Sequence, residues 1–159
     1  MEDLRAWLAR YGAPLMGGSA VEGHAAPSRE DVFAEALALA RKDSSVARAL
    51  PVALWRNRSK LDLPKLKAKA SGARQERTLG FFLDLTGRLG HSKKLTEAAR
   101  SLHKPSVRLT PFFALHTRAE RELAAHRTPD VAREWGFSMN MPLDSFETMF
   151  RKFETPGPR

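Results

Sequence analysis

The chain has 159 residues, of which 42% are hydrophobic and 28% are charged, and it contains no cysteine. This composition predicts one globular domain with a core of its own and excludes a fully disordered chain. The lack of cysteine excludes disulfide bonds, thiolate metal sites and cysteine catalysis. The sequence has no long apolar run and begins with acidic residues, so we expect neither a membrane-spanning helix nor a signal peptide, and we predict a cytoplasmic protein.

The net charge of +9 is concentrated in the middle of the chain. Residues 41–108 carry 17 basic and five acidic side chains, whereas residues 1–40 have a net charge of −3 and residues 109–159 are neutral. Net charge informs about partners rather than about the fold. The basic middle therefore predicts a polyanionic partner.

The N-terminal part is expected to be an arm. An apolar stripe at helical spacing predicts a helix over residues 2–11, and residues 12–27 are rich in Gly, Ala and Pro, which is typical of a flexible linker. We therefore expect an N-terminal helix plus linker over residues 1–27, a helical domain over residues 28–154 and a disordered tail at residues 155–159.

Helix start signals divide the first half of the helical domain into short helices. Ser28 is a good N-cap and is followed by acidic residues in the first turn. Asp43 predicts a second start. Pro51 lacks the backbone N–H that a helix interior needs and would break or kink the helix, so we expect a second piece to begin there. Asp62, with Pro64 just inside, predicts a further short helix.

The strongest helical pattern covers residues 73–89, where apolar residues fall near one face and Gly90 supplies a stop. Gly80 and Gly87 lower the helix propensity by roughly 1 kcal/mol each relative to Ala. Two glycines in a core helix indicate that a neighbouring element packs closely against it. Ser92 predicts the N-cap of the next helix.

The last third begins with a change of pattern. Residues 105–116 have no helical period, and Pro111 argues against a central strand, so we expect one extended segment. Thr117 and Glu120 form a capping box and predict another helix, and a final helix is expected over residues 142–153. The predicted fold is all-α, an irregular bundle of about six to eight short helices.

The candidate binding residues are basic side chains of the middle region. Each Lys or Arg that neutralises a phosphate releases condensed counterions, which favours nucleic acid as the partner. Trp55 precedes two of these residues and is a candidate for stacking on a base. The predicted nucleic-acid-binding residues are Arg56, Arg58, Lys60, Lys65, Lys67, Lys69, Lys93 and Lys94.

The favoured interpretation is a non-enzymatic nucleic-acid-binding module that engages the phosphate backbone with little direct base readout. Such a module fits a subunit of a nucleoprotein assembly or a small antitoxin-like regulator. A protein-interaction subunit with an acidic partner is the first alternative. No pair of histidines has metal-ligand spacing and no Gly-rich phosphate loop is present, so we expect neither a metal nor a cofactor.

Residues 128–137 resemble the first half of a helix-turn-helix unit. Ala132 and Gly136 stand four apart, where a small residue admits the second helix and a glycine makes the turn. The resemblance implies DNA reading by the following helix. Pro142 falls where a recognition helix should already be running, and Asp144 would repel phosphate, so the competing interpretation is two short helices packed by their aromatic residues.

Arg121 and His126 match the Arg-x4-His spacing of helical HEPN-type ribonucleases, in which the two residues act on an RNA phosphodiester. The resemblance implies a metal-independent ribonuclease as the second alternative. It covers only these two residues, and Glu122 stands where the family tends to place Asn, Asp or His.

Overall fold

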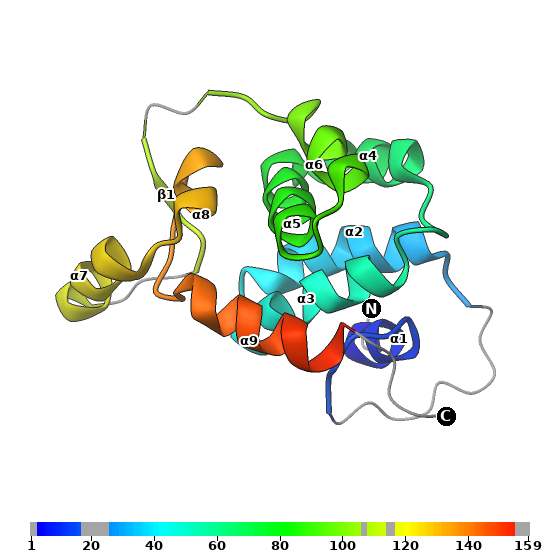
Figure 1. The fold of residues 1–159 in the computed structure, drawn as a ribbon, viewed down its shortest axis with the longest axis horizontal. Coiled ribbons are helices and arrows are strands. Elements are labelled where there is room, and N and C mark those ends of the chain that lie inside the picture. Colours follow the sequence, from blue (N-terminus) through cyan, green and yellow to red (C-terminus); the bar gives the residue numbers. More distant parts are fainter. Residues whose placement is uncertain (1–2, 17–25, 106–107, 114–116, 155–159) are drawn as a thin grey trace.

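The computed structural model describes residues 3–16, 26–105, 108–113 and 117–154, and this part of the chain is mostly helical (Figure 1). The expected all-α, irregular bundle of short helices is confirmed. In chain order the described elements are α1 (Leu4–Arg10), α2 (Arg29–Ala40), α3 (Ser44–Arg56), α4 (Leu63–Gly72), α5 (Glu76–Leu89), α6 (Lys93–Arg100), β1 (Thr110–Pro111), α7 (Arg118–Arg127), α8 (Asp130–Glu134), β2 (Phe137–Ser138) and α9 (Leu143–Phe153). None of the described helices is both long and apolar enough to cross a membrane.

Side-chain caps begin five of these helices where the sequence predicted them. The oxygens of Ser28, Asp43, Asp62 and Ser92 accept hydrogen bonds from backbone N–H groups in the first turns of α2, α3, α4 and α6. Thr117 makes the predicted capping box at the start of α7. Each cap satisfies a backbone donor that the helix itself leaves unpaired.

The predicted break at Pro51 is wrong, because α3 continues through it. A proline inside a helix removes one backbone hydrogen bond and crowds the preceding turn. In α3 the residues on both sides of Pro51 are buried, and the helix packs against α2, α5 and α9. This burial of apolar surface holds the helix together across the proline.

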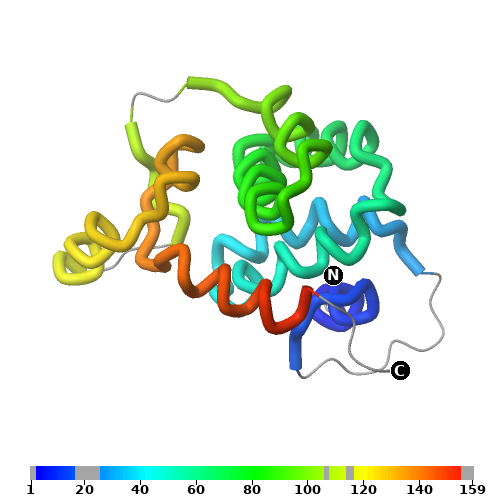
Figure 2. The backbone as a smooth tube through the Cα atoms, viewed as in Figure 1, coloured from blue at the N-terminus to red at the C-terminus, as the bar shows by residue number. Residues whose placement is uncertain are grey.

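The helix α5 is the centre of the bundle and packs on α2, α3, α4, α6 and α8. Figure 2 shows α5 and α6 side by side, joined by a short turn. The close packing predicted at the α5 glycines is confirmed, since Gly80 lies against the indole of Trp135 and Gly87 against α6. The helix begins at Glu76 rather than at residue 73, because Arg74 adopts a left-handed backbone conformation with a φ of 58°.

The first helix belongs to the bundle and is not a separate arm. Leu4, Trp7 and Leu8 are buried in the same core cluster as the rest of the domain. The segment after α1 is also held, since Asn57 donates a side-chain hydrogen bond to the carbonyl of Tyr11. Residues 17–25 of the expected linker and the expected tail at residues 155–159 lie outside the described residues.

Within the expected extended segment, residues Thr110–Pro111 form the strand β1, which pairs in parallel with β2. The backbone N–H of Thr110 donates to the carbonyl of Gly136 at 2.7 Å, and that of Phe112 donates to Ser138 at 2.8 Å. This pairing also corrects the helix-turn-helix interpretation. After α8 the chain passes through Gly136, with a φ of 78°, into a strand, and α9 then packs against α3.

A Gly80→Ala substitution is expected to destabilise the protein, because the added Cβ would collide with the Trp135 indole. Overpacking of this kind costs about 2 kcal/mol of unfolding free energy, which chemical denaturation measures. Gly72→Ala is the matched control, since a Cβ there meets nothing within 4 Å, and it should leave the stability unchanged or raise it by about 0.5 kcal/mol. Equal stability of the two variants would contradict the packing described for α5.

Candidate anion site

The predicted residues at the end of α3 have separate roles. Arg56 is half-buried, and its Nη1 donates to the carbonyl of Gly12 at 2.9 Å, so it holds the segment after α1. Arg58 lies over Trp55, with its Cζ 3.8 Å from the ring centroid. It therefore covers the ring that the sequence offered for base stacking. Lys60 is exposed in the following turn.

Two of the three predicted lysines on α4 are engaged within the fold. The Nζ of Lys67 donates to the Ser101 hydroxyl at 2.6 Å, and Lys69 forms an ion pair with Asp31. The hydrogen bond from Lys69 lowers the pKa of the Asp31 carboxyl below its ordinary value. Of these three lysines, Lys65 is exposed and the other two are half-buried.

Lys93 and Lys94 lie exposed at the start of α6. The Lys104–Glu76 ion pair places the residues after α6 beside the start of α5. The helices α5 and α6 are therefore antiparallel. Lys93 and Lys94 lie at the C-terminal end of α5, roughly 20 Å along its axis from the Lys104–Glu76 ion pair. The eight predicted residues thus lie at the end of α3, on α4 and at the start of α6, and the first and last of these groups adjoin because Trp55 packs against Gly90.

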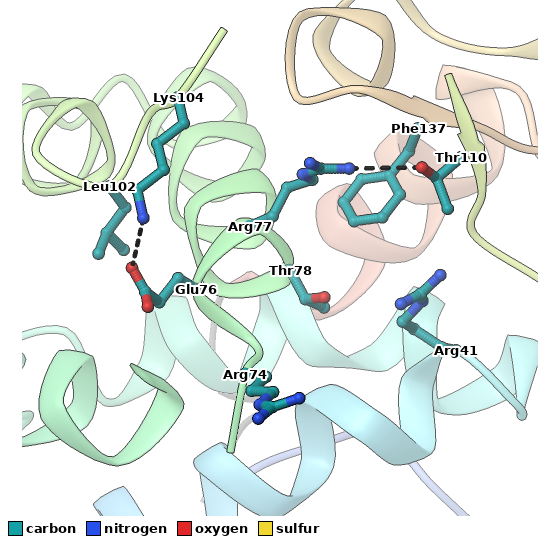
Figure 3. Close-up of a pocket in the computed structure, with 9 residues that line it drawn as sticks. All are labelled: Arg41, Arg74, Glu76, Arg77, Thr78, Leu102, Lys104, Thr110 and Phe137. Carbon is teal, nitrogen blue, oxygen red and sulfur yellow. Dashed lines mark hydrogen bonds and ion pairs between the residues drawn. The ribbon is translucent and has the colours of Figure 1, made fainter. Parts of the chain in front are cut away.

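A different group of basic residues converges on one cavity of about 330 Å³, which we call the arginine pocket (Figure 3). Four cationic side chains line it, namely Arg41, Arg74, Arg77 and Lys104. They come from the C-terminal cap of α2, the turn before α5, the first turn of α5 and the segment after α6. The remaining lining residues are Glu76, Thr78, Leu102, Thr110 and Phe137.

Arg41 is fixed in place by the extended segment. Its Nη2 donates to the carbonyl of Pro111 at 2.8 Å and its Nε donates to that of Phe112 at 3.2 Å, while its Cζ lies 5.2 Å from the Phe137 ring centroid. Among the described residues its Nη1 has no hydrogen-bond partner. Burial lowers the pKa of the Arg41 guanidinium, and the positive charge of Arg77 lowers it further.

Arg77 and Arg74 are the other two arginines that line the pocket. Arg77 donates to the hydroxyl of Thr110 at 3.4 Å and lies with its Cζ 5.8 Å from the Phe137 ring. Arg74 is exposed, and within the described part of the chain its side chain makes no hydrogen bond or ion pair. Figure 3 shows the three guanidinium groups arranged around Thr78.

The negative charge that lines this pocket is already paired with a lysine. Glu76 is the one carboxylate among its described lining residues, and it lies 3.7 Å from the Nζ of Lys104 and accepts from the Ser71 hydroxyl at 2.9 Å. Like charges repel strongly where water is partly excluded, so an anion entering the pocket would relieve the repulsion among the arginines. Guanidinium groups bind phosphate with paired, charge-assisted hydrogen bonds.

The residues of the ribonuclease alternative do not form a site of this kind. Arg121 and His126 are both exposed on α7, and five residues of helix separate them by about 140° around its axis. They therefore project in different directions. Among the described residues, no group of three His, Asp or Glu side chains is placed to hold a metal ion.

Sequence reasoning missed the arginine pocket. Arg74, Arg77 and Lys104 lie in the basic middle but outside its densest runs, and Arg41 stands at its edge. The only local signal was the extended segment, because its backbone carbonyl groups require hydrogen-bond donors. In the structure Arg41 donates to two of them.

Comparison with known proteins assigns no family to the chain. No family model, no curated protein and no solved structure matches it. The function is therefore inferred from the geometry and charge of the arginine pocket.

Pyrophosphate is expected to stabilise the folded protein, because it binds the pocket and relieves the repulsion there. For a dissociation constant of about 1 mM, about 10 mM pyrophosphate adds roughly 1.4 kcal/mol and raises the melting temperature by about 3–6 °C at constant ionic strength. Arg77→Gln should lose most of this shift in a thermal melt. Arg121→Gln on α7 removes the same charge and should keep it, and equal shifts in both variants would contradict the site.

Proposed function

We propose that the protein binds nucleic acid and that the arginine pocket holds phosphate groups of the backbone. One observation carries the proposal. Arg41, Arg74 and Arg77 converge on a single cavity whose one described carboxylate is already paired with Lys104. Three guanidinium groups in such a place are matched by a compact, multiply charged anion, and phosphate is the form in which nucleic acid presents that charge.

The surroundings of the pocket support contact with more than one phosphate. Lys42 is exposed beside Arg41 on one side, and Lys104 is exposed on the other. Cations in a row along the path of a backbone add affinity by counterion release and carry little sequence information. The proposed function is therefore that of a non-enzymatic module that binds the nucleic-acid backbone. Any selection of base sequence depends on contacts outside the arginine pocket.

The proposal is tested by oligonucleotide binding at several salt concentrations, followed by fluorescence anisotropy. The double variant Arg74→Gln/Arg77→Gln should weaken binding about tenfold and reduce the slope of log affinity against log salt by about two, because two phosphate contacts are lost. Lys93→Gln/Lys94→Gln is the matched control, since it removes the same charge at the far end of α5. It should change the affinity less than about threefold.

Three outcomes would contradict the proposal. The first is no binding of either single-stranded or duplex oligonucleotides at low salt. The second is an equal loss of affinity in the two double variants, which would indicate diffuse attraction to the basic surface. The third is displacement of the oligonucleotide by polyglutamate at the same charge concentration as by competitor DNA, which would favour an acidic protein partner instead.

A further inference from the structure

A second hollow adjoins the arginine pocket and shares Arg41 with it. Its volume is about 670 Å³. The same two chain segments line both hollows, because Arg74 and Thr110 face the first while the next residues, Gln75 and Pro111, face the second. Arg41 therefore lines both hollows and stands between them, and its guanidinium is held by hydrogen bonds to the extended segment.

The second hollow differs in chemistry from the first. Phe113 is half-buried and packs edge-on against Phe112, with the ring centroids 4.8 Å apart, and Pro111 beside it is exposed. The Oε1 of Gln75 accepts from the Thr78 hydroxyl at 2.8 Å, and among the described residues the amide nitrogen has no acceptor, so it can donate to a ligand. An aromatic face with hydrogen-bond donors at its rim is what an unpaired nucleobase requires.

Building on the proposed function, we propose that the two hollows together hold a nucleotide unit of single-stranded nucleic acid. The phosphate lies in the arginine pocket, and the attached base stacks on Phe113 in the adjoining hollow. The fixed guanidinium of Arg41 contacts the phosphate and separates it from the base. A base inside a duplex is already stacked and paired, so it does not reach this surface without being unpaired, and single strands are the preferred partner.

Trp55, the other aromatic residue next to basic side chains, does not offer such a surface. Arg58 covers its ring at 3.8 Å, Phe150 packs against it in a T-shaped arrangement, and the backbone of Gly90 packs closely against it. Base stacking is therefore assigned to Phe113, whose ring is partly exposed and lies beside the arginine pocket.

The experiment compares three probes of similar phosphate number: a thymidine 12-mer, an abasic 12-mer and a duplex. The wild-type protein should bind the thymidine strand about tenfold more tightly than the abasic strand, because base stacking adds to the phosphate contacts. Phe113→Leu should remove this preference while leaving the affinity for the abasic strand unchanged. Phe113→Tyr keeps an aromatic ring and should retain the preference.

Phe153→Leu at the end of α9 is the matched control, since Phe153 is also half-buried and lies in a different hollow. It should bind all three probes as the wild type does. A preserved preference in Phe113→Leu, or equal binding of thymidine and abasic strands by the wild type, would overturn the inference. The proposed function then still stands if Arg74→Gln/Arg77→Gln weakens binding of every probe, and it fails separately if that variant binds them unchanged.

Discussion

Packing of phenylalanine rings from four separate segments holds the extended segment and the last helix against α5. Phe81 of α5 contacts Phe112, Phe137 and Phe146, with ring centroids 5.7, 6.1 and 6.1 Å apart, and all four side chains are fully buried. Aromatic rings are among the side chains that contribute most buried apolar area to a core. Arg41 lies over the Phe112 and Phe137 rings, and Phe137 forms part of the floor of the arginine pocket.

The arginine pocket holds positive charges close together, and their mutual repulsion opposes folding. Contacts between guanidinium groups and aromatic faces contribute roughly 0.5–2 kcal/mol each, and the carbonyl groups of the extended segment accept two hydrogen bonds from Arg41. These contacts orient the guanidinium but do not neutralise it. The proposed phosphate ligand does so, and because the pocket is already formed, little conformational entropy is lost when the ligand binds.

Local sequence signals predicted the helices well and the site poorly, because helix caps depend on neighbouring residues whereas the site depends on contacts between distant segments. An N-cap such as Ser28 or Thr117 acts on backbone groups within one helical turn, so a short window of sequence contains the whole interaction. Pro51 was misjudged because its local cost is outweighed by the packing of α3, which depends on distant helices. Arg41 and Phe137 likewise meet only through the β1–β2 pairing, whereas charge density alone selected lysines such as Lys69 that the fold pairs with acids.

The central claim is that phosphate binds at the arginine pocket, and nuclear magnetic resonance of the arginine side chains tests it most directly. The Nε–Hε signals would be followed while a single-stranded oligonucleotide is added to the protein. The signals of Arg41 and Arg77 are predicted to shift progressively and to saturate together, while that of Arg121 stays unchanged. Shifts confined to Arg58 and to backbone signals at the start of α6, with Arg41 and Arg77 unaffected, would contradict the account.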